Sequence, residues 1–292
     1  MSLLQSILLG LVQGITEFLP VSSSGHLAIL RNLFGIELQD GPFFDVMLHL
    51  GTMIAICAVF RKDLIRMLKE SVNMVMDMIY NLKILFHNKK EQDARRYKKI
   101  IHNNYRKFTL MVLVSTVPTA VIGYAAQELV NIAGMTLIAP GVCLILNAGL
   151  LLVADVVEAG KKVPKDAAYT NAFVVGIAQG LAVMPGLSRA GITILACLLN
   201  GFDRRFAVKY SFIMSIPAII GAMILELTRI SAQATAMSQI AVYLVGAIIA
   251  GITGYVCIRK MLVIVRKKQF KGFSLYCLVI GILAIVGHFL TR

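Results

Sequence analysis

The chain has 292 residues, of which 58% are hydrophobic and 15% charged, and its mean hydropathy is +0.79. Soluble globular domains carry about 25% charged residues, so this composition excludes an ordinary soluble fold. The net charge of +14 does not indicate a nucleic-acid module, because no aromatic–basic stacking pattern is present and 25 of the 29 Lys and Arg residues fall in four segments: 13 in 61–107, three in 161–165, three in 204–209 and six in 259–271.

The first predicted element is an apolar stretch, 2–34, that is broken near its middle by Pro20 and the run Ser22–Gly25. A similar break, at Pro185, Gly186 and Ser188, interrupts the apolar stretch 170–200. Irregular backbone cannot face lipid, because unpaired amides cost several kcal/mol in hydrocarbon. Each stretch is therefore predicted to be a re-entrant hairpin of two short helices.

Uninterrupted apolar runs of about 17–25 residues predict spanning helices. Three such runs follow each hairpin: 43–60, 108–125 and 136–157 after the first, and 210–228, 238–258 and 273–290 after the second. The five cysteines lie singly within apolar stretches and are expected to be packing residues. The predicted fold is an all-α, polytopic membrane protein with six transmembrane helices and two re-entrant helical hairpins.

Basic loops are retained on the cytoplasmic side of membrane proteins. With the four basic segments inside, the hairpin 2–34 opens to the outside, the hairpin 170–200 opens to the cytoplasm, and both chain ends lie outside. No Lys or Arg precedes Arg31, so a removable secretory signal is not expected. The segment 61–107 is predicted to be a cytoplasmic amphipathic insertion on the inner leaflet, with no chemistry of its own.

The two broken stretches also resemble each other in sequence. At an offset of 166, Gln13-Gly14 matches Gln179-Gly180, Ser22 matches Ser188, and Gly25 matches Gly191. An odd number of spans separates the two copies, which inverts the second. We therefore expect an inverted-topology repeat, residues 1–160 and 161–292, with the hairpin tips meeting near the midplane of the membrane.

The residues at the two tips carry the chemistry. Glu17 shares a helical face with Gln13, and the hydroxyls of Ser22, Ser23 and Ser24 with His26 offer a nucleophile and a proton carrier. An ionisable residue within the membrane is costly, so Glu17 needs a cation, a metal or water beside it. In the second tip, Arg189 can hold a phosphate with two parallel hydrogen bonds. The backbone at Gly186–Gly191 can add an anion-binding nest.

These motifs resemble those of the undecaprenyl-diphosphate phosphatases, also called bacitracin-resistance proteins, over essentially the whole chain. The resemblance rests on Gln13-x-x-x-Glu17, on Pro20-Val21-Ser22-Ser23-Ser24-Gly25-His26, on Pro185-Gly186-Leu187-Ser188-Arg189 and on Ser211–Pro217. It implies removal of the terminal phosphate from undecaprenyl diphosphate on the outer leaflet of the bacterial inner membrane, which recycles the carrier lipid of peptidoglycan synthesis and confers bacitracin resistance. Many members have Glu where this chain has Gln13, and a second Ser where it has Ala190.

The resemblance and the residues together define the expected site. Glu17, Ser23, His26 and Arg189 are the predicted catalytic residues, with either Ser23 or water as the nucleophile, and the substrate-binding set is Gln13, Ser22, Ser24, Gly186, Ser188 and Thr193. A diphosphate brings more negative charge than one Arg neutralises, so a divalent cation (Mg²⁺ or Ca²⁺) bridging to Glu17 fits the site, although no metal-ligand spacing specifies it. Asp45 and His49 are expected either to support the site or to be polar packing residues.

The expected partners are a polyprenyl diphosphate lipid and the bilayer, with no nucleic acid, and the sequence leaves a homodimer open. A transporter or flippase for a phosphorylated lipid is the alternative function, because inverted repeats with broken helices also build transporters. A carrier has no need for Ser, His and Glu clustered beside an Arg, so the phosphatase is the favoured prediction.

Overall fold

The computed structural model describes residues 1–35, 43–90, 95–228 and 237–290, and every regular element in these ranges is a helix. The first half of the chain forms α1 (Leu3–Thr16), α2 (Ser23–Phe34), α3 (Phe43–Val59), α4 (Arg61–Lys90), α5 (Asn104–Ala125), α6 (Gln127–Gly134) and α7 (Ile138–Val156). The second half forms α8 (Tyr169–Leu181), α9 (Arg189–Leu199), α10 (Arg204–Leu227), α11 (Met237–Arg266) and α12 (Lys271–Leu290). The all-α prediction is confirmed.

Five helices are long and apolar enough to cross a membrane, namely α5, α7, α10, α11 and α12. The number rises to six if α3 and α4, which meet at an angle of 86°, are counted as one broken span. The predicted run 238–258 continues as helix to Arg266, so the basic segment 259–271 is mostly helical rather than a loop. Lys and Arg are good helix formers, and they extend α11 beyond its apolar part.

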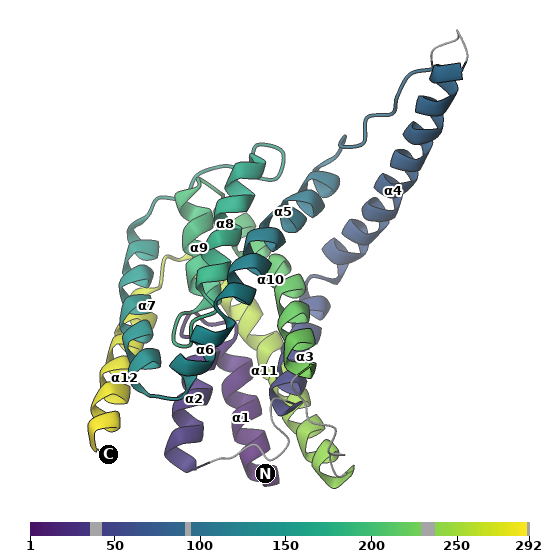
Figure 1. Ribbon diagram of the computed structural model, residues 1–292. Coiled ribbons are helices and arrows are strands. Elements are labelled where there is room, and N and C mark those ends of the chain that lie inside the picture. Colours follow the sequence, from purple (N-terminus) through teal and green to yellow (C-terminus); the bar gives the residue numbers. More distant parts are fainter. Residues whose placement is uncertain (36–42, 91–94, 229–236, 291–292) are drawn as a thin grey trace.

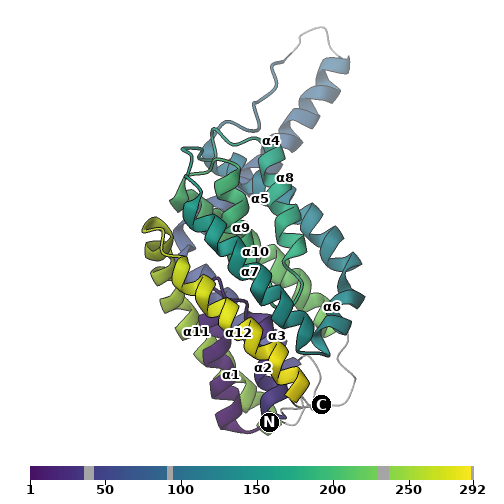
Figure 2. The ribbon, with the colours of Figure 1, turned by 90° about the vertical axis from the view of Figure 1, so that its left-hand side faces the viewer.

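Two hairpins of short helices fill the middle of the bundle. The outer ends of α1 and α2 lie at the end of the molecule that holds the start of the chain, whereas those of α8 and α9 lie at the opposite end, and the two tips point toward each other (Figures 1 and 2). The hairpins hold the predicted site residues and pack among the longer helices, with Leu4 of α1 and Leu181 of α8 exposed on the flank.

Small residues let each hairpin approach its neighbour closely. A Cβ added to Gly10 of α1 would lie 2.4 Å from the carbonyl oxygen of Gly246 in α11, and one added to Gly176 of α8 would lie 2.2 Å from that of Ser115 in α5. Close backbone packing through small residues is typical of helix interfaces within membranes. The first hairpin thus packs closely against α11, and the second hairpin packs closely against α5.

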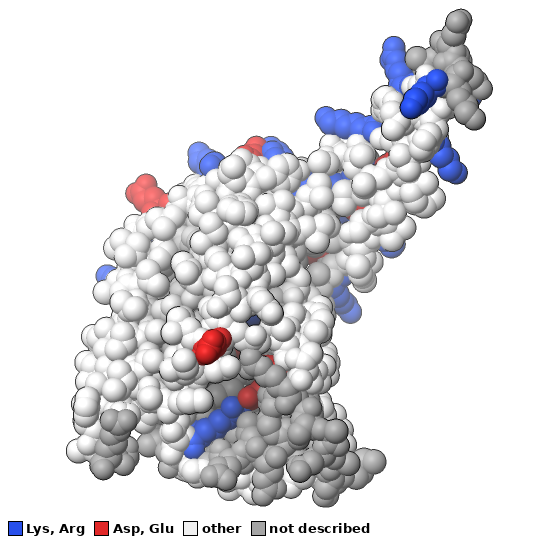
Figure 3. All heavy atoms as spheres, viewed as in Figure 1, with Lys and Arg blue, Asp and Glu red and all other residues white. Residues whose placement is uncertain are grey.

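The flank of the bundle is apolar and almost free of charge (Figure 3). Large aliphatic side chains such as Leu146, Leu275 and Leu283 are 57–63% exposed on it. Basic residues gather instead on α4, which extends away from the bundle at the end opposite the start of the chain (Figures 1 and 3). An uncharged, apolar flank of this kind is what a bilayer requires.

The base of α4 is tied to α5 by one buried guanidinium. Arg106, 3% exposed, donates to Glu70 and Asp77 of α4, at 2.7 Å each, and to the carbonyl oxygen of Ile100 at 2.6 Å. The Arg106 hydrogen bonds lower the pKa of Glu70 and of Asp77 below the ordinary carboxyl values. α4 is therefore held by this charged cluster as well as by its buried apolar residues Met67, Met74 and Ile84.

Candidate active site

The first hairpin turns between Glu17, which caps the end of α1, and Ser22, which caps the start of α2. Ser22 has a positive φ of 70°, an uncommon backbone conformation for a residue other than glycine. Its hydroxyl accepts a hydrogen bond from the Gly25 amide, 3.3 Å away, and so satisfies one of the free N–H groups at the start of the helix. This turn presents Glu17, Ser23 and Ser24 on one side.

In the second hairpin a serine again caps the helix that follows, although the backbone of the turn differs. Ser188 caps the helix by accepting from the Gly191 amide at 3.2 Å. Gly186 has a φ of 99°, and a Cβ there would lie 2.3 Å from the carbonyl oxygen of Pro140 in α7. Only glycine fits this position, and the close approach fixes the start of α9, where Arg189 is the first helical residue.

Direct hydrogen bonds join the two tips. The Gly186 amide donates to the Ser22 hydroxyl at 3.1 Å. Asn147, fully buried on α7, contacts both tips: its Nδ2 donates to the carbonyl oxygen of Pro20 at 2.9 Å, and its Oδ1 accepts from the Ser188 amide at 3.1 Å. Asn147 was not predicted to be a site residue, because the sequence shows it only as a single amide side chain within an apolar run.

Glu17 is the centre of the site. One carboxylate oxygen pairs with the Arg189 guanidinium. The other accepts hydrogen bonds from the Ser23 hydroxyl at 2.6 Å and from Gln13 Nε2 at 3.1 Å. The Glu17 side chain is 2% exposed and that of Arg189 25%. Burying a carboxylate is costly unless it is paired and hydrogen-bonded, and here every interaction favours its charged form.

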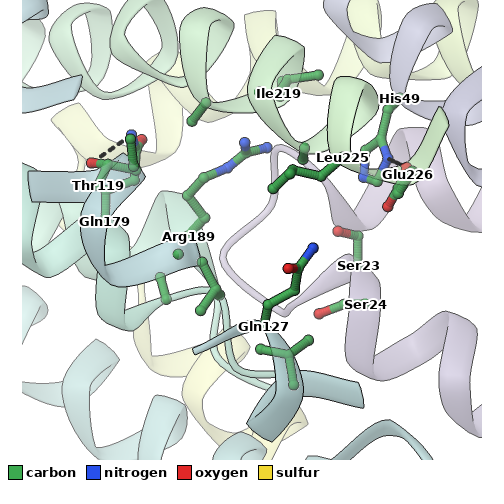
Figure 4. A pocket seen from close by; sticks show the side chains of 18 of the residues that line it. Ser23, Ser24, His49, Thr119, Gln127, Gln179, Arg189, Ile219, Leu225 and Glu226 are labelled. Atoms are coloured by element: carbon green, nitrogen blue, oxygen red, sulfur yellow. Dashed lines mark hydrogen bonds and ion pairs between the residues drawn. The ribbon is translucent and has the colours of Figure 1, made fainter. Parts of the chain in front are cut away.

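Glu17, Ser23 and Arg189 open onto a cavity of about 620 Å³ between the two tips, α3, α5, α6 and α10. Arg189 reaches in from one side, Ser23, His49 and Glu226 lie on the opposite side, and Gln127 points in from α6 (Figure 4). Much of the remaining lining is apolar, including Val183, Leu187, Ile219 and Leu225. The cavity thus combines a small charged centre with walls suited to a hydrocarbon chain.

The structure brings together most of the predicted site residues, though not all. Ser22, Ser24 and Ser188 line the cavity with the three central residues, whereas Gln13 and Gly186 lie behind the lining. The Thr193 hydroxyl donates to the carbonyl oxygen of Arg189 at 2.7 Å and contacts Ser211, so it supports α9 rather than the cavity surface.

His26 also lies outside the lining of the cavity. Its Nδ1 contacts the carbonyl oxygen of Ser22 at 2.7 Å, and its Nε2 contacts the Tyr276 hydroxyl at 2.8 Å. The imidazole stacks on the Tyr276 ring, with the two centroids 5.5 Å apart. His26 therefore points toward α12. Its contact with the Ser22 carbonyl oxygen stabilises the turn between α1 and α2.

Sequence reasoning missed several polar residues of the cavity wall, including Glu226 of α10, Gln127 of α6 and Thr119 of α5. His49, considered as a supporting residue, lines the cavity itself, whereas Asp45 pairs with Arg31 beside α2. Glu226 and Gln127 lie at helix ends and Thr119 lies within α5, so only tertiary packing reveals that they meet.

A divalent cation would find few protein ligands at this site. Within the described ranges, no three His, Cys, Asp or Glu side chains cluster as metal ligands. The carboxylate of Glu17 lines the cavity and is an oxygen donor of the kind that Mg²⁺ and Ca²⁺ prefer, whereas Gln13 Oε1, which is buried without a hydrogen-bond partner, lies behind the lining. One carboxylate fits a cation held mainly by a phosphorylated substrate.

Comparison with known proteins identifies the family of this chain. The sequence profile of the bacitracin resistance protein BacA family matches residues 6–283. The chain is 34% identical over 286 residues to an undecaprenyl-diphosphatase of Alkaliphilus metalliredigens, covering 98% of each chain. It is 36% identical over 293 residues to one of Desulforapulum autotrophicum, covering 100% of each. With five to six helices able to cross a bilayer, this multi-pass membrane protein belongs to the bacitracin resistance protein BacA family.

Proposed function

We propose that this protein hydrolyses undecaprenyl diphosphate to undecaprenyl phosphate and inorganic phosphate, and so recycles the lipid carrier of peptidoglycan synthesis and confers bacitracin resistance. The observation that carries the proposal is the 2.6 Å hydrogen bond from the Ser23 hydroxyl to Glu17, in a cavity that also exposes Arg189. A nucleophile bonded to a base, beside a guanidinium, is the arrangement that phosphoryl transfer needs.

In the proposed reaction, Arg189 binds the terminal phosphate through its guanidinium and stabilises the charge that develops on it. The Ser23 oxygen attacks the terminal phosphorus while its proton passes to Glu17, and the bond from this phosphorus to the bridging oxygen breaks. Undecaprenyl phosphate leaves, and water then releases inorganic phosphate from Ser23. The apolar cavity wall accommodates the first isoprene units of the lipid.

We further propose a divalent cation, Mg²⁺ or Ca²⁺, bound between the diphosphate and Glu17. Mg²⁺ commonly uses one or two carboxylates together with substrate phosphates, which agrees with the small number of protein donors here. The cation would offset the negative charge of the diphosphate.

The inverted repeat is the proposed origin of this site. Shifted by the offset of 166, α1 (Leu3–Thr16) falls on 169–182, where α8 spans Tyr169–Leu181, and α2 (Ser23–Phe34) falls on 189–200, where α9 spans Arg189–Leu199. The capping residues Ser22 and Ser188 correspond as well. These matches support two hairpins of the same descent that enter the bilayer from opposite sides.

We place the cavity on the outer side of the bacterial inner membrane, because the basic α4 and the loop at 161–165 lie at the other end of the bundle. Single cysteines at Ser2, Asn88 and Gln269, in a background without native cysteines, test this orientation with an impermeant maleimide on intact cells. Labelling at Ser2 alone is expected, and labelling at Asn88 without Ser2 would reverse the orientation. The predicted outer position of Arg292 lies outside the described residues.

The function itself is tested by phosphate release from undecaprenyl diphosphate with purified protein, with and without a chelator. Release that falls on chelation and returns with Mg²⁺ or Ca²⁺ is expected. Movement of the lipid between leaflets without phosphate release would instead identify a transporter. Mass measurement in detergent tests whether the protein is a homodimer, which stays a prediction.

A further inference from the structure

The cavity holds a second pair of ionisable side chains that the reaction described above does not use. His49 of α3 and Glu226 of α10 both line the cavity, and His49 Nδ1 lies 3.8 Å from Glu226 Oε2. Each side chain is 26% exposed. Figure 4 shows the pair beside Ser23, on the wall that faces Arg189. Both residues are therefore within reach of a molecule bound between Ser23 and Arg189.

His49 differs from His26 in having a ring nitrogen at the cavity wall that makes no hydrogen bond. Its Nδ1, 3.8 Å from Glu226 Oε2, is buried without a hydrogen-bond partner in the described part of the chain. In His26, by contrast, both nitrogens are engaged. No other described histidine lines this cavity. Catalytic hydrogen bonds are often long before substrate binds, so 3.8 Å suits a pair that tightens in the complex.

The two-step reaction needs a second proton acceptor. In the first step Glu17 takes the proton of Ser23, so it cannot also take a proton from the water that attacks in the second step. Resting on the proposed function, we propose that His49, oriented by Glu226, accepts the proton of this water. A carboxylate beside an imidazole fixes its tautomer and stabilises the imidazolium that forms.

With His49 as the second base, every bond and proton of the second step is accounted for. The water oxygen bonds to the phosphorus carried by Ser23, the bond from that phosphorus to the Ser23 oxygen breaks, and this oxygen recovers its proton from Glu17. The proton of the water passes to His49, which loses it to the released phosphate or to solvent. The charged groups around His49 are Glu226, the Asp45–Arg31 pair, which lies outside the cavity lining, and Glu17 with Arg189 in the cavity.

The test uses purified full-length protein and undecaprenyl diphosphate labelled on its terminal phosphate. His49→Gln keeps the size and polarity of the side chain but removes the base. Loss of a general base costs about 10²–10⁴-fold in rate, so steady-state turnover is expected to fall by at least about 100-fold. The first turnover is expected to persist, with one equivalent of undecaprenyl phosphate released and the label retained on Ser23.

Glu226→Gln leaves His49 in place and is expected to lower turnover by about ten-fold and to shift the pH profile of kcat. The matched control is His288→Gln, because His288 is a buried histidine of α12 that does not line the cavity, and its turnover should equal that of the wild type. Turnover of His49→Gln within a few-fold of the wild type, or loss of its first turnover as well, would overturn the role of His49. Absence of phosphate release by the wild type would instead contradict the proposed function.

Discussion

The tip between α1 and α2 and the tip between α8 and α9 share one helix-capping arrangement but present different side chains. In both, a serine caps the second helix by accepting from the amide of a glycine three residues later. The residue after the capping serine is Ser23 in the first tip and Arg189 in the second. Equivalent positions of the two capped helices thus supply the hydroxyl and the cation of one site.

The difference between the tips is as informative as their likeness. The position equivalent to Glu17 in the second hairpin is Val183, and the position equivalent to Gln13 is Gln179. One turn therefore carries the negative charge and the nucleophile, and the other carries the positive charge. Two identical tips would put like charges together inside the membrane, which is unfavourable.

The largest expected effect comes from breaking the ion pair between the tips. Glu17→Gln and Arg189→Lys should each lower phosphate release by about 10³-fold or more, because Glu17 accepts the Ser23 proton and a lysine cannot reproduce the guanidinium fork. Glu17→Gln also leaves the Arg189 guanidinium without its charged partner, at a cost of about 3–5 kcal/mol, whereas Arg189→Lys keeps both charges. Phosphate release and thermal unfolding in detergent measure the two effects.

A double variant separates the two roles of this pair. Glu17→Gln with Arg189→Met removes both charges, so stability should largely return while activity should not. Near-normal turnover in either single variant would contradict the assignment of the site.

The next effect distinguishes the serines of the first tip. Ser23→Ala should lower turnover by about 10³-fold with little loss of stability, since its hydroxyl is the expected nucleophile. Ser22→Ala should instead destabilise the protein by about 1–3 kcal/mol, because the amides of Gly25 and Gly186 both lose an acceptor. If Ser23→Ala keeps its activity, water is the nucleophile.

Much of this arrangement could be predicted from the sequence. Pro, Gly and Ser interrupt two apolar stretches, so both hairpins, their approximate bounds and the charged residues Glu17 and Arg189 follow from local chemistry, whereas the choice of Ser23 among three serines came from the family resemblance. The orientation of His26 could not be predicted, because it depends on Tyr276 of α12, 250 residues away. Asn147 and Glu226 were missed for a similar reason: an isolated polar residue in a span acquires its role only through the helices packed against it.

A smaller loss of stability tests whether both hairpins depend on close backbone packing against their neighbouring helices. Gly10→Ala and Gly176→Ala would each place a Cβ within 2.4 Å of a backbone oxygen on the neighbouring long helix, and such overpacking costs about 1–3 kcal/mol. Gly149→Ala of α7 is the control, because a Cβ there meets nothing within 4 Å, and it should be neutral or slightly stabilising. Unfolding in detergent measures all three. A large loss in only one of the two hairpin variants would mean that the hairpins are held differently.

The smallest expected effect concerns α4, which has no counterpart in the second half of the chain. Hydrogen bonds from Arg106 hold the pKa of Glu70 and of Asp77 below the ordinary values near 4. A carboxyl group whose pKa is lowered in the folded state stabilises that state fully above its unfolded pKa and loses this contribution as the pH falls through the lowered value. α4 should therefore stay in place at neutral pH and loosen from α5 in acid, below about pH 4.

Spin labels at the exposed positions Ile79 of α4 and Val117 of α5 can report the distance between the two helices. The distance distribution should be narrow at pH 7 and broad in acid, whereas Glu70→Gln with Asp77→Asn should be broad at both. Glu158→Gln, at an exposed carboxyl group outside this cluster, should behave like the wild type. A wild-type distance that does not change in acid would mean that packing rather than charge holds α4, and the insertion would then be as firmly anchored as the two hairpins.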